Sequence, residues 1–275
     1  MPELRLIGDL KTVEVDFYQT VTGSTNDWLN MAQAIKDNWD EAAGFIIWAP
    51  EKSLLQLAGT ASLACSGLGK PVVVFSSPRP GSLNQKKFEQ LGIKSIILNA
   101  SYVAASDLAE VLVLEGQNLY RVPTCLWGGK GSIKSFAKPL ASVDFSLQIH
   151  LPFFKRQKSE PDNTRLTFSQ NFKVLPWSPS LSEPVFEKDE QVLVLVDSAY
   201  WPSDDLQSLR GKLKKNKIST IWHSPEPFEE ENWSGNELGI SHSSQWWAIL
   251  LSQIALGSFT NQKQAFAFIE KNLGL

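Results

Sequence analysis

The residue types that most often do chemistry are few in this chain and lie far apart. Its three histidines, His150, His223 and His242, show no HxxxH or Cys/His spacing, so the sequence predicts no metal site. Asp197, Ser198 and His223 each follow a predicted strand in the C-terminal part of the chain. A Ser-His-Asp hydrolase would need these three to meet, but no nucleophile-elbow motif surrounds Ser198, which disfavours a triad.

The two cysteines, Cys65 and Cys125, offer thiol chemistry but are too few for a disulfide framework, which is typical of a cytoplasmic protein. Cys65 falls on an apolar helical stripe and is expected in the core. Cys125 with a distant histidine would make a thiol hydrolase, yet no nucleophile-turn signature surrounds it. Residues 127–132, WGGKGS, lack the GxxxxGK[ST] spacing of a phosphate loop, so no cofactor is predicted.

The composition excludes two classes of partner. The formal net charge is -3, and lysine and arginine do not gather on one predicted face, so there is no footprint for nucleic acid. No apolar stretch reaches the roughly 20 residues that span a membrane, so no membrane association is predicted. With 275 residues, 43% of them hydrophobic, the chain is long enough for one large core and one smaller core.

The chain is organised around residues 42–80, which read as strand, loop, helix and strand. Residues 44–48 form a short apolar run, residues 53–66 carry apolar side chains at three- and four-residue spacing, and residues 72–75 form a second apolar run. We therefore expect two neighbouring parallel strands joined right-handedly by the helix. In such a unit the functional loop follows the first strand, here at residues 48–53.

The rest of the chain continues this alternation in two parts. Before the central unit we expect a strand at 13–20 and a helix at 28–39. After it we expect a helical segment near 86–91, strands at 93–98 and 111–115, and a hairpin into 119–122. A proline-rich region separates these from a second α/β pattern, with strands expected at 172–175, 192–196 and 218–222 and helices at 206–215, at about 245–256 and after a cap at Thr260 or Asn261. The predicted organisation is an N-terminal domain at 1–150, a linker at 151–170 and a smaller C-terminal domain at 171–275.

Several of these segments resemble the bacterial L-asparaginase/glutaminase family. GSTNDWLNMAQAI is similar to the family's turn and tryptophan-bearing helix, and GFIIWAPEKSLLQLAGTASLACSGLGKPVVVFSSPRP is similar to its central strand, helix and Lys-Pro-Val-Val strand. The positions in register are Gly44, Phe45, Ala61, Leu68, Lys70, Pro71, Val72, Val73, Arg79 and Pro80. The resemblance implies an α/β fold with a larger, mainly parallel N-terminal domain and a smaller C-terminal α/β domain.

The resemblance also implies an amide-hydrolysing site, but the family's catalytic residues do not carry over. The chain is expected to begin after the family's first strand, without its Thr-Gly-Gly-Thr nucleophile loop. The family's Thr-Asp pair falls on Glu51 and Lys52, and its catalytic lysine falls on or beside Cys125. Ser24 and Thr25 remain from the turn that grips the substrate in the family. Acyl-enzyme hydrolysis needs a nucleophile with a base in reach, and neither Glu51 nor Lys52 replaces the missing hydroxyl.

The sequence thus predicts a catalytically inactive asparaginase-like protein that acts as a structural or regulatory subunit. It is expected to form a homo-oligomer or to associate with a catalytic asparaginase-like partner. Two alternatives stay open. One is an amidohydrolase with a rebuilt or partner-completed site, and the other is a protein that binds a small amino acid through Ser24 and Arg79.

Overall fold

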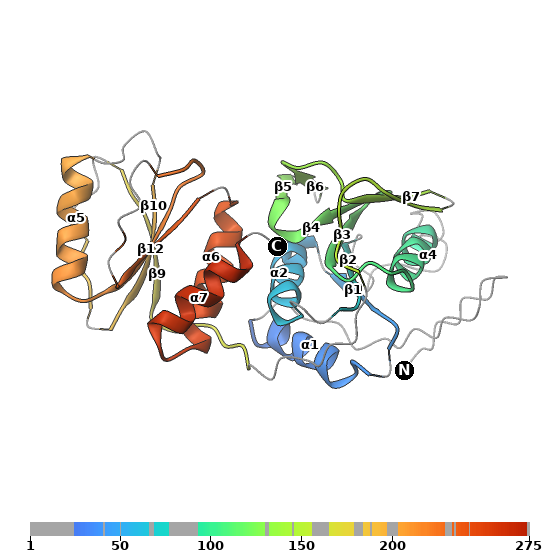
Figure 1. The fold of residues 1–275 in the computed structure, drawn as a ribbon, viewed down its shortest axis with the longest axis horizontal. Helices are drawn as coiled ribbons and strands as arrows, with labels where there is room; N and C mark the ends of the chain where they lie inside the picture. Colours follow the sequence, from blue (N-terminus) through green and yellow to red (C-terminus); the bar gives the residue numbers. More distant parts are fainter. Residues whose placement is uncertain are drawn as a thin grey trace. The chain divides into compact units, whose positions relative to one another are not determined.

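The computed structural model divides the chain into two compact units, Met1–Pro161 and Asp162–Leu275, which are described separately (Figure 1). The division falls inside the segment 151–170 that the sequence marks as a linker. The structure describes residues 25–40, 42–49, 51–65, 69–76, 93–129, 132–144, 146–155, 165–178, 184–187, 189–196, 203–228, 233, 235–241 and 243–273. The strand expected at 13–20 and the helical segment expected near 86–91 lie outside these residues.

The first unit is built on the expected β-α-β arrangement. Strand β1 (Phe45–Ala49) and strand β2 (Val72–Ser76) are parallel neighbours, with Ile47 opposite Val74, and helix α2 (Leu54–Ala64) connects them. This confirms the parallel pair predicted from sequence. Leu54, Leu57, Ala58 and Ala61 of α2 are fully buried, as their spacing predicts.

The sheet of the first unit is mixed rather than mainly parallel. Its order is β1-β2-β3-β4-β7-β8, and only β1, β2 and β3 (Val111–Glu115) run parallel. The following strands, β4 (Asn118–Arg121), β7 (Ala141–Asp144) and β8 (Ser146–Ile149), pair antiparallel. A short turn, η3 (Val122–Thr124), leads into a separate hairpin of β5 (Cys125–Gly129) and β6 (Ser132–Ser135). The sequence reading missed β5 to β8 because these strands are short and carry no strong turn signature.

The strand expected at 93–98 is wrong, because this segment begins helix α4 (Ile93–Ala104). Ile97, Ala100 and Val103 recur every third residue and pack into the core cluster beside Val73 and Phe75. A short apolar run does not distinguish a strand from a buried helix. Here the apolar positions continue past residue 98 at helical spacing. A helix therefore buries all of them on one face, against the core.

Helices α2 and α4 cover opposite faces of the parallel strands (Figure 1). Because β1 to β2 and β2 to β3 step in the same direction, the two crossovers have opposite hands, and one departs from the right-handed rule. Helix α1 (Thr25–Asp37) packs on α2. Lys70 Nζ holds the end of α1 by donating to the carbonyl oxygens of Trp39 and Ala42, the latter at 2.9 Å.

The second unit is a four-stranded, fully parallel sheet with the order β12-β11-β10-β9. The strands are β9 (Phe172–Pro176), β10 (Gln191–Leu195), β11 (Ser219–His223) and β12 (Glu237–Ile240). Its helices are α5 (Asp204–Lys215), α6 (Gln245–Ser258) and α7 (Gln262–Asn272). The sequence predicts all of these elements except β12. Helix α7 is capped by Asn261, whose side chain accepts from the Lys263 backbone N–H.

Residues 165–170 belong with the second unit through hydrogen bonds to the end of α6. Thr167 Oγ1 donates to the Gly257 carbonyl at 2.5 Å, and Ser169 N donates to the Gln253 carbonyl at 3.0 Å. The backbone comes so close that a Cβ at Gly257 would lie 2.3 Å from Ser169 N. No helix among the described residues is long and apolar enough to cross a membrane.

Candidate functional site

The turn that follows β1 is the place where an open α/β sheet carries its ligand site. Ala49 ends β1, and the 3-10 turn η1 (Glu51–Ser53) then leads directly into α2. Lys52 is exposed on this turn, whereas Ser53, Leu54 and Leu55 are buried. The turn therefore presents an ammonium group to solvent and directs its next side chains into the core.

The two substrate-gripping residues expected from the sequence are placed only in part. Thr25 is the first residue of α1 and is exposed. Ser24 lies outside the described residues, as do Arg79 of the proposed amino-acid binder and the Asp197 and Ser198 pair of the weighed triad. Helix α1 begins at Thr25 and ends at Asp37, so it starts three residues and ends two residues before the range 28–39 expected from the sequence.

Cys125, at the position of the family's lysine, is a buried thiol. It opens β5 with no exposed surface, and its Sγ donates to the Arg121 carbonyl oxygen at 3.4 Å. Burial raises the pKa of the Cys125 thiol to about 12, the nearby Glu115 carboxylate adds to the rise, and a hydrogen bond with Thr124 opposes it. At neutral pH the thiol is protonated, and a protonated thiol is a poor nucleophile.

A short ladder of hydroxyl groups lies beside Cys125. Ser135 Oγ donates to Thr124 Oγ1 at 3.0 Å, and Thr124 Oγ1 donates to the Arg121 carbonyl oxygen at 2.8 Å. The Ala137 backbone N–H donates to Ser135 Oγ at 3.1 Å. Each hydroxyl proton is thus directed at an oxygen within the fold. The ladder ties the hairpin of β5 and β6 to the turn η3.

Glu115 is an acidic residue close to Cys125, and it was not among the site residues predicted from the sequence. It ends β3 at the carboxyl edge of the parallel strands. Burial raises the pKa of its carboxyl above 4.5, and a hydrogen bond from the Ile133 backbone N–H opposes the rise. Its position as a charged residue at the end of a buried apolar strand is the sequence signal that could have identified Glu115. Its carboxylate accepts from β6 and so fastens the hairpin.

Arg121, which lies in the segment similar to the family's Gly-Arg-x-x-Lys pattern, forms hydrogen bonds that join parts of the first unit. Its Nε and Nη2 donate to the two carboxylate oxygens of Glu110 at 2.6 and 2.9 Å, and Nη2 also donates to the Pro152 carbonyl at 2.7 Å. The Phe154 backbone N–H donates to Glu110 at 3.0 Å. The pair joins β4 to the end of the first unit.

The described histidines are also held by neighbours. His223 ends β11, is buried, and its Nε2 lies 3.0 Å from the Ser243 carbonyl oxygen. Burial lowers the pKa of His223 below 6.5, against the opposing effect of that hydrogen bond. His150 is exposed, with Nε2 2.9 Å from Ser142 Oγ. Within the part of the chain that the structure describes, no three His, Cys, Asp or Glu side chains gather as a metal site.

The fold is that of an α/β protein with two units. Residues 1–140, slightly more than half of the 275, match the family profile described as "Asparaginase, N-terminal", and the chain therefore belongs to the asparaginase family. It is similar to L-asparaginase 1 of Escherichia coli strain K12 and of strain O157:H7, at 30% identity over 133 residues in both cases. Each match covers 46% of this chain and 36% of the relative, so the chain matches about a third of their length.

Solved structures support the same fold. L-asparaginase I of Vibrio cholerae has a TM-score of 0.70 at 16% identity, over 92% of this chain and 82% of that one. The thermostable L-asparaginase of Thermococcus kodakarensis has a TM-score of 0.67 at 13% identity, over 90% and 80%. A probable cytoplasmic L-asparaginase of Campylobacter jejuni has a TM-score of 0.67 at 16% identity, over 90% and 84%. At these identities the likeness concerns the fold.

Proposed function

We propose that this asparaginase-family chain is a non-catalytic subunit with a structural or regulatory role. The observation that carries the proposal is the difference in exposure between the two positions where the family resemblance places catalysis. Lys52 is exposed on the turn after β1, whereas Cys125 is buried within the hairpin and holds its proton on the Arg121 carbonyl. A catalytic pair has to meet within hydrogen-bond reach, and these two side chains lie in opposite environments.

The state of the thiol supports the same conclusion. With a pKa of about 12, about one Cys125 thiol in 10⁵ is ionised at neutral pH. A lysine at that position would carry an ammonium group for electrostatic or acid-base work, and the cysteine supplies neither a charge nor a ready nucleophile. The Thr124 and Ser135 hydroxyl groups donate within the fold, so they serve the hairpin.

The competing proposal is an amidohydrolase with a rebuilt or partner-completed site. It is favoured by the position of Glu115, whose carboxyl has a raised pKa and lies at the carboxyl edge of β3, close enough to Cys125 to raise the pKa of its thiol. A carboxyl with a raised pKa is typical of general acid-base catalysis. We rank it second, because both the Glu115 carboxylate and the neighbouring hydroxyl groups have partners within the hairpin.

The proposed subunit acts in the cytoplasm, as a homo-oligomer or with a catalytic asparaginase-like partner. Two observations support the compartment: both cysteines are buried and neither forms a disulfide, and one structural relative is described as a probable cytoplasmic L-asparaginase. The family resemblance, in which neighbouring subunits complete the site, supports the association. In a regulatory role, such a subunit would respond to the binding of a small amino acid.

The test is ammonia release from asparagine and glutamine by the purified chain, with E. coli L-asparaginase 1 as the positive control. We expect no turnover above the buffer blank. A turnover of about 1 per second or more, an ordinary enzymatic rate, would contradict the proposal. If that activity were lost in Glu115→Gln and retained in Lys52→Gln, the rebuilt site around Glu115 would replace the non-catalytic role.

A further inference from the structure

The hairpin of β5 and β6 has one buried face and one face that is apolar and exposed. Cys125 and Ile133 are buried on the inner face. On the outer face Leu126 lies directly opposite Lys134. Phe136 follows β6, and its backbone N–H donates to the Thr124 carbonyl oxygen at 3.2 Å, so the ladder and its alternation continue to Phe136. Leu126 is 37% exposed and Phe136 is 56% exposed. Successive residues of a strand point to opposite faces, so these three side chains are neighbours on one surface.

This surface is unusual for a two-stranded ribbon. The outer face of such a ribbon is normally polar, because only one of its faces has a core to pack against. Here Leu126 of β5, and Phe136 just after β6, leave apolar side chains exposed on that face. Exposed apolar groups that gather within a polar rim mark surfaces used for binding. We call Leu126, Lys134, Phe136 and Lys138 the hairpin patch.

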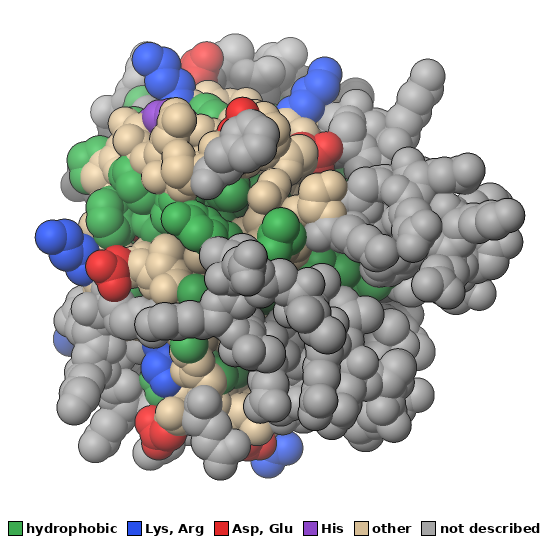
Figure 2. Space-filling view, turned by 90° about the vertical axis from the view of Figure 1, so that its right-hand side faces the viewer, with side chains coloured by type: hydrophobic (Ala, Val, Ile, Leu, Met, Phe, Trp, Pro, Cys, Tyr) green, Lys and Arg blue, Asp and Glu red, His purple; other side chains and the backbone are tan. Residues whose placement is uncertain are grey.

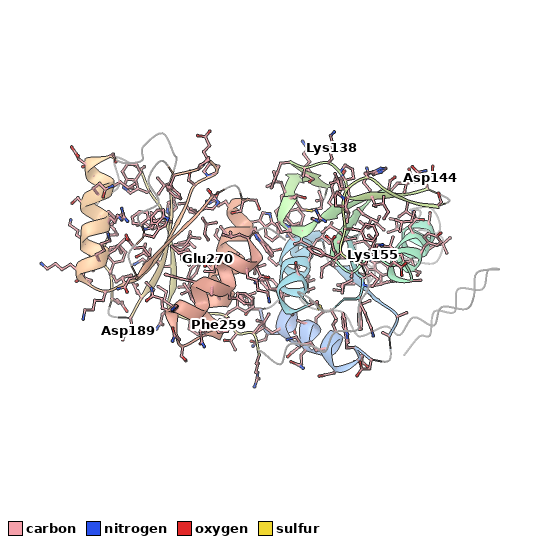
Figure 3. All side chains as sticks on the ribbon, viewed as in Figure 1. Lys138, Asp144, Lys155, Asp189, Phe259 and Glu270 are labelled. Carbon is pink, nitrogen blue, oxygen red and sulfur yellow. The ribbon has the colours of Figure 1, made fainter. Side chains whose placement is uncertain are left out.

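The charge of the hairpin patch is positive. Lys134 is exposed beside Leu126, and Lys138 lies two residues beyond Phe136, where Figure 3 shows its side chain projecting outward from the first unit. Among the described residues neither lysine forms an ion pair. Carboxylates of a bound partner would therefore meet these two ammonium groups without competition from described acidic neighbours, and complementary charge favours both encounter and register.

We propose that the hairpin patch docks an acidic protein segment that carries apolar side chains at alternate positions. The apolar side chains would pack on Leu126 and Phe136, and the carboxylates would lie against Lys134 and Lys138. Nucleic acid fits less well, because its affinity depends on several phosphate contacts and the patch offers two lysines on a chain of net charge -3. The inference deepens the proposed subunit role by naming the chemistry of a partner, and it rests on that role.

A second exposed apolar area of the first unit provides the matched control. Leu98 on α4 is 44% exposed, and Tyr102 follows one helical turn later. Figure 2 looks at the side of the first unit that carries α4 and β7 and shows hydrophobic side chains gathered among charged ones. Replacing Leu98 removes an equally exposed apolar side chain without touching the hairpin patch.

The experiment measures fluorescence anisotropy of a labelled peptide in which glutamate alternates with leucine and phenylalanine, titrated with the full chain. We expect saturable binding that weakens about tenfold or more in Leu126→Ser/Phe136→Ser, as for the loss of interface anchors. Lys134→Glu/Lys138→Glu should weaken it by a similar factor and remove its salt dependence. Leu98→Ser should bind within about twofold of the unaltered chain, and unchanged thermal unfolding would show that the variants fold.

Four results would overturn the inference: no binding of the acidic peptide, equal loss in Leu98→Ser, preference for a twin peptide with lysine in place of glutamate, or tighter binding of an oligo-dT strand. A concentration-dependent dimer abolished by Leu126→Ser/Phe136→Ser would assign the surface to a second copy of the chain instead. The assay reads binding and not turnover, so its failure leaves the result of the ammonia assay, and the non-catalytic role that the assay tests, unaffected.

Discussion

Each unit contains an arginine–glutamate pair, and the two pairs are buried to different depths. In the first unit the Glu110 side chain is 7% exposed and pairs with Arg121 at 2.6 Å. In the second unit the Glu237 side chain is 1% exposed and pairs with both Arg210, at 2.7 Å, and Lys214, at 3.1 Å. The second carboxylate is thus more deeply buried and serves two cations.

The two glutamates lie at the same end of their sheets, away from the end where a ligand site is expected. Glu110 immediately precedes β3, and Glu237 is the first residue of β12, so both stand at the amino ends of parallel strands. Open α/β sheets bind ligands at the opposite, carboxyl ends. The strongest charge interactions described in this molecule therefore hold strands to their neighbours. The carboxyl ends, at Ala49 and Glu115, lead into turns whose Lys52, Gly116 and Gln117 are exposed.

The largest effect is expected for Glu237→Ala. The change leaves Arg210 and Lys214 without their shared carboxylate at a buried site, and breaking such a pair costs about 3–5 kcal/mol. Urea unfolding followed by tryptophan fluorescence measures the loss. Glu237→Gln, which keeps the shape and one acceptor, should lose less. A loss below about 1 kcal/mol, the range of surface pairs, would show that the depth of burial does not matter here.

A smaller loss is expected for Glu110→Ala. Arg121 is partly exposed and would be hydrated in the variant, while the Phe154 backbone N–H would lose its acceptor. An unsatisfied donor of this kind costs about 1–3 kcal/mol. The same urea measurement applies. If Glu110→Ala proves more damaging than Glu237→Ala, the ranking of the two units is reversed.

Two helical glycines of the second unit extend the comparison to uncharged contacts. A Cβ at Gly257 would lie 2.3 Å from Ser169 N, so Gly257→Ala should push residues 167–169 from α6 and cost about 1–3 kcal/mol. Gly211 on α5 has nothing within 4 Å of such a Cβ, so Gly211→Ala should stabilise the chain by about 0.5–1 kcal/mol. Thermal unfolding of both variants tests the difference. Equal melting temperatures would contradict it.

The smallest effect concerns pH. Burial lowers the pKa of His223, so below pH 6.5 the unfolded chain binds a proton that the folded chain resists. The stability that the folded chain gains from the neutral His223 ring is therefore fully present above the pKa of His223 in the unfolded chain. It falls as the pH drops toward the lower pKa of His223 in the folded chain. His223→Asn should flatten that dependence, whereas His150→Asn, at an exposed site, is the control for loss of an imidazole ring. An unchanged pH slope in His223→Asn would count against the burial effect.

The sequence predicts the parallel strands of both units except β12, because continuous apolar runs bounded by polar or turn-forming residues are typical of buried strands. Residues 72–75 and 192–196 show this directly, and β2 and β10 follow them closely. Residues 93–98 fail because six residues cannot show whether the apolar period is that of a helix. The strands between residues 125 and 149 fail because each is only four or five residues long, too short to distinguish an alternating pattern from chance.

The candidate site is less predictable than the fold. The resemblance places Lys52 and Cys125 at catalytic positions, but it does not indicate that one is exposed and the other buried. The partners of Cys125, the Arg121 carbonyl and the hydroxyl ladder, are set by the turn η3 and the hairpin pairing, and neither has a sequence signature. Glu110 and Arg121 are eleven residues apart, and only the register of β3 and β4 brings them together.

The most direct test of the central claim, that the catalytic positions now serve the fold, is the reactivity of Cys125. The Cys65→Ala variant leaves Cys125 as the single thiol, and its reaction with DTNB is followed at mildly alkaline pH. Because the thiol is buried with a pKa of about 12, we expect no reaction until urea unfolds the chain. Reaction in the folded chain at the rate of free cysteine would reveal an accessible thiolate and contradict the account.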